Sequence, residues 1–194
     1  SRTETIKIKD SISVELEVKE SRHGPIMNNA LELEDEIYPI SMHWVYTALP
    51  GKLLTATYDF AHSEKIEESR EAAASIHAPG LNVMYGDADN NYARWSAAKI
   101  PQRPDHVTGK LFLDGSTGLD DILGYYDFGF NPQSENAPWG YTYSANNRPD
   151  TTKGIMHLGY YLSEDRGRRI IKMLDEKQNW NVEATKKMMT DITS

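Results

Sequence analysis

The chain has 194 residues, of which 39% are hydrophobic and 26% are charged, and its formal net charge is −8. This length and composition are ordinary for one globular domain with a core of its own. The negative charge argues against nucleic acid or an anionic membrane as the main partner. The chain contains no cysteine, which excludes disulfides and thiolate metal sites. No apolar run approaches the roughly 20 residues that a membrane span requires.

The first 50 residues predict strands joined by polar loops. Residues 5–9 and 11–19 alternate polar and apolar side chains on either side of the break at Asp10-Ser11. Alternation with a period of two across such a break predicts a β-hairpin with one solvated face. The acidic run Glu32, Glu34, Asp35 and Glu36 indicates a solvated loop. Residues 40–48 are rich in strand formers and predict a buried strand.

Three helices are predicted where a capping side chain precedes a helical pattern. They cover residues 63–77, 164–176 and 182–192. The expected capping residues are Ser63, Ser163 and Asn181. Acidic side chains in the first turn of the first of these helices suit its positive end.

A second hairpin is predicted over residues 81–98, with its turn at Asp87–Asn91. Asp87 and Asp89 have the spacing that opens a calcium-binding loop, which makes a metal site the competing interpretation. Such a loop needs glycine at its sixth position and glutamate at its twelfth, and Tyr92 and Ala98 stand there instead. A tight turn built on Asp and Asn is therefore favoured.

The most informative stretch follows the turn at residues 138–140. Residues 141–145 form a short apolar and aromatic run that predicts a strand, and Asn146 and Asn147 end it before Arg148-Pro149. Two asparagines at this place are typical of a simple turn, because Asn tolerates left-handed backbone angles. They also offer side-chain amide donors and acceptors at a defined position. Arg166 lies 19 residues beyond Asn147, at the start of a helical pattern.

The pattern Ala-Asn-Asn-Arg-Pro, followed by Asp-Arg-x-x-Arg-Ile over residues 165–170, resembles the β-subunit of the penicillin acylases. That family consists of N-terminal-nucleophile amidohydrolases. The step Arg22-His23-Gly24-Pro25 and the Asp87 turn occur in the same order in the family. The resemblance implies an α+β fold, an antiparallel sheet-rich fragment of the αββα type with several helices. It also implies that residues 1–194 form a single domain in the central to late part of the β-subunit.

The resemblance assigns roles to particular residues. In this family an asparagine after the strand supplies the oxyanion hole, and a downstream arginine holds the surroundings of the nucleophile. The local match places these roles on Asn146 and Arg166, with Asn147 as the neighbour that shapes the turn. Ala56 and Leu81 fall where family members line the acyl pocket, although packing in the core is the simpler explanation for apolar side chains.

No metal and no cofactor are expected from this chain. The calcium-binding acids of the family lie mostly upstream of the matched region. The downstream one would fall near Ile155, whose side chain cannot ligate calcium.

The activity implied by the resemblance is hydrolysis of a linear amide through acyl transfer to an N-terminal serine. Ser1 is not expected to be that serine, because Arg2-Thr3-Glu4-Thr5 resembles a segment well downstream of the nucleophile. The chain alone is therefore expected to be inactive. Its expected partners are the remaining α- and β-subunit segments of the same precursor and a small-molecule amide substrate. Exposed apolar surface is expected to favour self-association.

Two questions stay open at the level of sequence. The acyl group can be that of a penicillin, an acyl-homoserine lactone or a peptide-like amide. The alternative function is a non-catalytic, β-rich binding or interaction module with a helical tail. The resemblance implies a periplasmic or secreted location.

Overall fold

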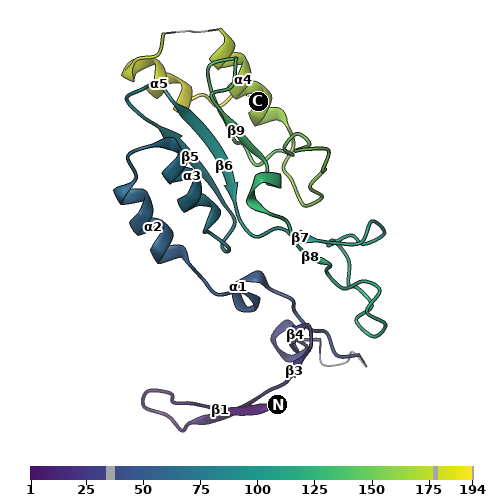
Figure 1. The fold of residues 1–194 in the computed structure, drawn as a ribbon. Coiled ribbons are helices and arrows are strands. Elements are labelled where there is room, and N and C mark those ends of the chain that lie inside the picture. Colours follow the sequence, from purple (N-terminus) through teal and green to yellow (C-terminus); the bar gives the residue numbers. More distant parts are fainter. Residues whose placement is uncertain (34–37, 177–178, 194) are drawn as a thin grey trace. The chain divides into compact units, whose positions relative to one another are not determined.

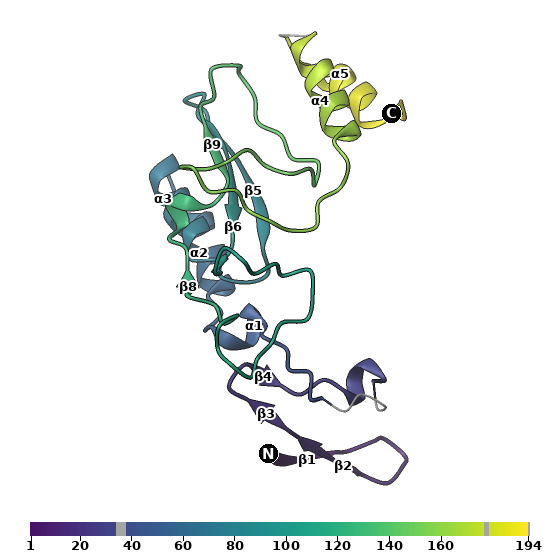
Figure 2. The same ribbon diagram turned by 90° about the vertical axis from the view of Figure 1, so that its right-hand side faces the viewer.

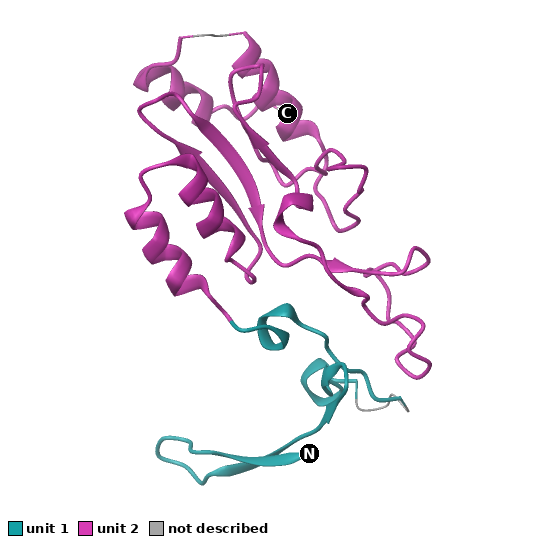
Figure 3. Ribbon diagram, in the orientation of Figure 1, with its two compact units in different colours: residues 1–50 teal, residues 51–194 magenta. Residues whose placement is uncertain are grey.

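The computed structural model describes residues 1–33, 38–176 and 179–193, and its chain divides into two compact units, Ser1–Pro50 and Gly51–Ser194 (Figure 3). Helices and antiparallel strands are both present, which confirms the predicted α+β class. Whether both units belong to one domain stays a prediction. Three of the acidic residues expected in a loop, Glu34, Asp35 and Glu36, lie outside the described residues.

The first unit opens with the predicted hairpin. Strands β1 (Arg2–Ile6) and β2 (Val14–Val18) pair in antiparallel register, with Ile6 opposite Val14 and Arg2 opposite Val18. A second, two-residue pair joins β3 (Glu20–Ser21) to β4 (Gly24–Pro25), and the short 3₁₀ helix η1 (Asn29–Leu31) follows. The hairpin is confirmed, but its loop is wider than the predicted break at Asp10-Ser11, and side chains on both of its faces are exposed.

The predicted strand over residues 40–48 is wrong. Pairing there is limited to a bridge between Ile26 and Ser41, and Met42 N–H donates to Pro25 at 3.0 Å. Because β4 ends at Pro25, no further ladder is available, and the chain turns into the short helix α1 (Val45–Ala48). Strand propensity decides the structure only where a neighbouring strand offers ladder bonds.

The second unit is built on a three-stranded antiparallel sheet in the order β5-β6-β9 (Figure 1). Its strands are β5 (Leu81–Gly86), β6 (Tyr92–Ala97) and β9 (Gln133–Glu135), and the first two form the predicted second hairpin. In its turn the Asp87 carboxylate accepts backbone N–H bonds from Asp89 at 2.9 Å and Asn91 at 2.8 Å. These bonds explain the turn without a metal ion.

Helices α2 (Leu53–His62) and α3 (Ile66–Ala74) cover one face of this sheet. Alternate residues of β6, namely Ala93, Trp95 and Ala97, are 0% exposed and pack with side chains of both helices. The remaining residues of β6, including Arg94, therefore face the other side of the sheet.

The predicted helix over 63–77 is present as α3 (Ile66–Ala74), but its predicted cap is wrong, because Ser63 ends α2 instead of beginning α3. Its hydroxyl and its N–H both donate to Phe60 O, at 3.0 and 3.4 Å. Near the start of α3 the carboxylate of Glu68, and not the hydroxyl of Ser63, accepts a backbone hydrogen bond. Its donor is the N–H of Glu64, at 2.7 Å. A serine can cap either end of a helix, and the sequence pattern alone does not distinguish the two.

The long segment between β6 and α4 is ordered, with little regular structure. It contains the paired strands β7 (Pro101–Gln102) and β8 (Gly124–Tyr125) and the 3₁₀ helix η2 (Phe128–Phe130). Beyond β9 the chain continues as an irregular connection to the C-terminal helices (Figure 2). None of the helices in the described ranges is long and apolar enough to cross a membrane.

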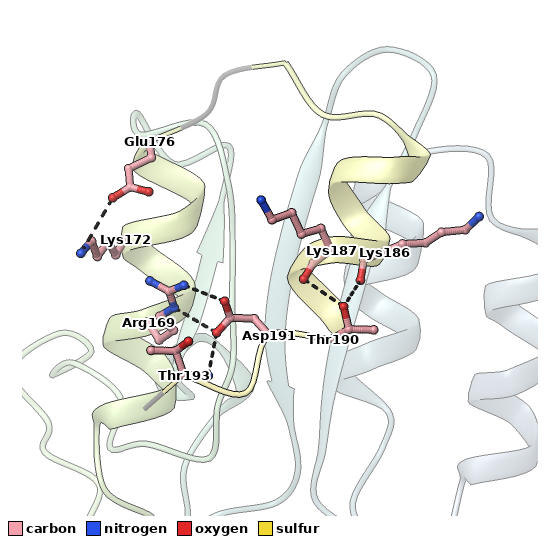
Figure 4. A network of polar contacts seen from close by, with 8 residues as sticks. All are labelled: Arg169, Lys172, Glu176, Lys186, Lys187, Thr190, Asp191 and Thr193. Atoms are coloured by element: carbon pink, nitrogen blue, oxygen red, sulfur yellow. Dashed lines mark hydrogen bonds and ion pairs between the residues drawn. The ribbon is translucent and has the colours of Figure 1, made fainter.

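The last two helices are α4 (Asp165–Asp175) and α5 (Val182–Met189). Asn181 caps α5 as predicted, since its side chain accepts the Ala184 N–H at 2.9 Å. The Arg169 guanidinium donates twice to the Asp191 carboxylate, Nε at 3.1 Å and the second nitrogen at 2.6 Å (Figure 4). This fork holds the end of α5 against α4 and leaves the first turn of α4 free to contact the asparagine pair.

Candidate functional site

Residues 141–147 run antiparallel to α4 without forming a strand. The Tyr141 hydroxyl donates to Asp175 at 2.8 Å near the end of the helix, and the far end of the segment meets Arg166 in the first turn. The predicted strand over 141–145 is therefore wrong. Side-chain contacts with a helix take the place of ladder bonds here, because the segment finds no strand partner within the described residues.

Asn146 and Arg166 are in direct contact. One guanidinium nitrogen of Arg166 donates to the backbone oxygen of Ala145 at 2.5 Å and to Asn146 Oδ1 at 2.7 Å. The Leu162 N–H donates to the backbone oxygen of Asn146 at 2.9 Å. The asparagine is thus held by its side chain and by its main chain at once.

The backbone of Asn146 is left-handed, with a φ of 59°. This is the conformation that the simple-turn interpretation of the pair expected, and asparagine adopts it more readily than most residues. The turn and the contact with Arg166 are therefore both present. The turn alone does not explain why a cation from 20 residues away binds the amide oxygen.

The arginine determines which way the Asn146 amide points. A guanidinium can only donate, so the amide oxygen faces Arg166 and the Nδ2 donors face away from it. Asn146 is exposed, and within the described ranges no residue accepts a hydrogen bond from its Nδ2. Two oriented N–H donors are therefore available to an external acceptor.

Asn147 has a different environment. It is half-buried, and its Nδ2 donates to the backbone oxygen of Arg148 at 3.3 Å. Its side-chain oxygen lies 3.3 Å from the point where a Cβ atom on Gly167 would stand. Asn147 therefore packs against α4 at a glycine, which agrees with the role of shaping the turn.

The two residues matched to an acyl pocket lie elsewhere. Ala56 is 0% exposed in the core between α2, α3 and the sheet. Leu81 is 41% exposed and pairs with Ala97 at the end of β5. The role of both in substrate binding stays a prediction.

Arg94 is the residue near this site that the sequence analysis missed. It lines a cavity of about 390 Å³ together with Trp139, Tyr143 and Asn147. In the sequence, an arginine at an alternating position of a strand indicates a solvated face. The sequence could therefore show only that Arg94 lies on the face of β6 opposite Trp95. The other residues that line this cavity lie 38 or more residues further along the chain.

No group of three or more His, Asp or Glu side chains in the described part of the chain is arranged to hold a metal ion. The expectation that this chain supplies no metal ligand stays a prediction.

The family model for penicillin amidase matches residues 1–194, so the chain belongs to the penicillin amidase family. This confirms the resemblance inferred from the Asn146 and Arg166 patterns. The described structure is similar to a thermostable penicillin G acylase from Alcaligenes faecalis, with a TM-score of 0.70 over 96% of this chain and 33% of that chain. At 22% identity this likeness shows the fold alone, and it agrees with the mixture of helices and antiparallel strands described above.

Sequence relatives add a second point of comparison. The chain is 26% identical over 205 residues to the acyl-homoserine lactone acylase QuiP of Pseudomonas aeruginosa, covering 100% of this chain and 24% of that protein. It is 28% identical over 163 residues to QuiP of Pseudomonas fluorescens, covering 76% of this chain and 18% of that protein. The chain thus spans about a quarter or less of the length of these relatives.

Proposed function

We propose that this chain is the oxyanion-binding part of a hydrolase that cleaves linear amides by acyl transfer to an N-terminal serine outside the chain. The observation that carries the proposal is the Arg166–Asn146 hydrogen bond of 2.7 Å, which turns the amide donors of an exposed asparagine outward. The family match and the acylases among its relatives support amide hydrolysis as the reaction.

In the proposed reaction the serine oxygen bonds to the carbonyl carbon of the amide, and the carbonyl oxygen gains negative charge. Asn146 Nδ2 donates to that oxygen, and the positive charge of Arg166 lies directly behind the amide. The N-terminal amine accepts the proton of the serine hydroxyl as the serine oxygen bonds to the carbonyl carbon. When the tetrahedral intermediate collapses, the carbon–nitrogen bond breaks and the leaving nitrogen takes that proton from the protonated amine. Water then hydrolyses the ester. A donor held by both Leu162 and Arg166 needs no reorganisation as the charge develops.

The substrate to test first is an N-acyl-homoserine lactone, because the QuiP relatives carry that activity in their names. A penicillin with an aromatic acyl group is the second substrate, after the structural relative. The remaining segments of the precursor are the proposed partners and supply the nucleophile. A periplasmic or secreted location and self-association of the chain are parts of this proposal.

The test is Asn146→Ala in the full-length enzyme. Loss of one oxyanion donor should lower kcat by roughly 100- to 1,000-fold, as it does in other acyl-transfer enzymes. The fold should persist because Asn146 is exposed, with a loss of about 1–2 kcal/mol in stability because alanine disfavours the left-handed φ of 59°. Circular dichroism and a thermal melt provide the check on folding.

Asn147→Ala serves as the matched control, since it removes the same amide one residue away. A loss of activity in Asn147→Ala with full activity in Asn146→Ala would move the role to Asn147. Full activity in both variants would refute the catalytic role and favour the interpretation of the asparagine pair as a simple turn. The 194-residue chain alone should release no amine from either substrate, and turnover that disappears in Ser1→Ala would contradict the assignment of the nucleophile to another segment.

A further inference from the structure

Beyond Asn146 the chain forms a closed loop. The Leu162 N–H donates to the backbone oxygen of Asn146 at 2.9 Å, which brings the two ends of the loop together. His157 anchors the loop to the rest of the second unit, because it is buried and its Nε2 donates to the backbone oxygen of Phe130 at 2.8 Å. The two ends of the loop therefore have defined positions relative to each other.

A second cavity, of about 290 Å³, lies between the ends of this loop and Lys110. Its volume is close to the lower end of the range of small-molecule sites. Its lining residues are Lys110, Arg148, Leu158, Gly159, Tyr160 and Tyr161. The Tyr160 hydroxyl donates to the backbone oxygen of Lys110 at 3.2 Å, and Lys110 Nζ lies 5.2 Å from the centre of the Tyr160 ring. These two contacts hold the lysine beside the loop, although the two segments are 50 residues apart.

The charges of this cavity are not balanced. Lys110 and Arg148 are its two cations, and no carboxylate is among the described residues that line it. Neither cation forms an ion pair in the part of the chain that the structure describes, since Lys110 contacts an aromatic ring and Arg148 donates to the sulfur of Met156. Burial raises the pKa of Tyr161, and the nearby positive charge of Arg148 opposes that shift. The cavity thus combines two positive charges with aromatic surface.

We propose that this cavity binds a soluble phosphate monoester with an aromatic or apolar organic group, held at its phosphate by Lys110 and Arg148. A phosphate monoester carries a charge of about −1.5 to −2 at pH 7, which matches two unbalanced cations better than a single negative charge does. Both side chains form charge-assisted hydrogen bonds with phosphate oxygens. Leu158 and Tyr160 are exposed and offer surface to the organic group.

The source of the phosphate is a small molecule in solution and not a lipid headgroup, because the net charge of −8 opposes approach to an anionic membrane. The inference rests on the cavity and its charges and does not depend on the catalytic role of Asn146.

The test is isothermal titration calorimetry of the 194-residue chain with phenyl phosphate as the probe. Phenyl sulfate is the reference, because it has nearly the same shape and a single negative charge. At about pH 8 the phosphate should bind about fivefold more tightly than the sulfate, which is the upper end of what one exposed ion pair contributes. At about pH 5 this preference should disappear, because the second pKa of a phosphate monoester is about 6. Equal binding of the two esters at the higher pH, or no binding of the phosphate, would overturn the proposal.

Lys110→Gln is the decisive variant, because Lys110 lines this cavity and not the cavity beside Arg94, which Arg148 also lines. It removes one of the two charges and should abolish the preference for the phosphate, and Arg148→Gln should do the same. Lys172→Gln removes a charge from an exposed position that lines neither cavity, and it should keep the preference. A folded Lys110→Gln variant that keeps the preference would overturn the proposal. Cosedimentation with phosphatidic acid vesicles, without binding of phenyl phosphate, would overturn the soluble source.

Discussion

Replacing Glu135 with alanine should destabilise the second unit, because this carboxylate is the acceptor at the centre of a partly buried network. Glu135 Oε1 accepts from Arg70 Nε at 2.6 Å and from Trp95 Nε1 at 2.7 Å. Glu135 Oε2 accepts from the second terminal nitrogen of Arg70 at 2.6 Å. The network joins α3, the centre of β6 and β9, so its loss affects the whole sheet.

The expected loss is about 2–4 kcal/mol in the free energy of unfolding. Trp95 is 0% exposed, and leaving its N–H without an acceptor costs about 1–3 kcal/mol. The Arg70 side chain is 35% exposed and can turn to water, so the lost ion pair adds only about 1 kcal/mol. Glu135→Gln retains an oxygen for Trp95 and should therefore cost less than Glu135→Ala.

The assay is urea unfolding followed by tryptophan fluorescence, since Trp95 is buried in the core of the second unit. Lys172→Gln breaks an exposed pair with a separation of 4.0 Å and should change stability by less than about 0.5 kcal/mol. A Glu135→Ala variant as stable as this control would refute the reasoning.

The same network predicts a pH dependence. The hydrogen bonds from Arg70 lower the pKa of Glu135 below its usual range. Its contribution to stability is therefore fully present above the unfolded pKa of about 4.3, and it is lost as the pH falls through the lower folded value. The stability difference between the unaltered chain and Glu135→Gln should accordingly shrink below about pH 4. A difference that grew on acidification would contradict this assignment.

Two further predictions concern other parts of the chain. Gly24→Ala should unfold the β3–β4 turn, because a Cβ there would lie 2.2 Å from Met42 O and the φ of Gly24 is 127°. Amide hydrogen exchange over residues 20–27 should therefore become faster. Gly51→Ala is the control and should leave the exchange unchanged, because nothing lies within 4 Å of the added atom. The pKa of Tyr141 is raised to about 12 by burial and by its bond to Asp175. An ultraviolet titration should therefore show a tyrosine that ionises near pH 12 and that is absent in Tyr141→Phe. The contribution of this hydrogen bond to the stability of the fold should persist to pH 10 and be lost as the pH rises through 12. A Tyr141→Phe titration identical to that of the unaltered chain would contradict the assignment.

The features that the sequence determined by itself are those whose bonds form between near neighbours. The alternation on either side of Asp10-Ser11 and of the Asp87 turn sufficed for both hairpins, because a hairpin pairs adjacent segments. The Asn181 cap needs only the N–H of Ala184, three residues away. The family resemblance, carried by the patterns around Asn146 and Arg166, was also available from the sequence, and the family match confirms it.

Tertiary structure alone decided the features whose partners lie far along the chain. Residues 141–145 have the composition of a strand, but they pack along α4, because no strand among the described residues pairs with them. Arg94 is half-buried because residues 132–152 and α4 line the cavity beside it. The free energy of a side chain depends on what surrounds it, and for these residues the surroundings come from segments that local patterns do not describe.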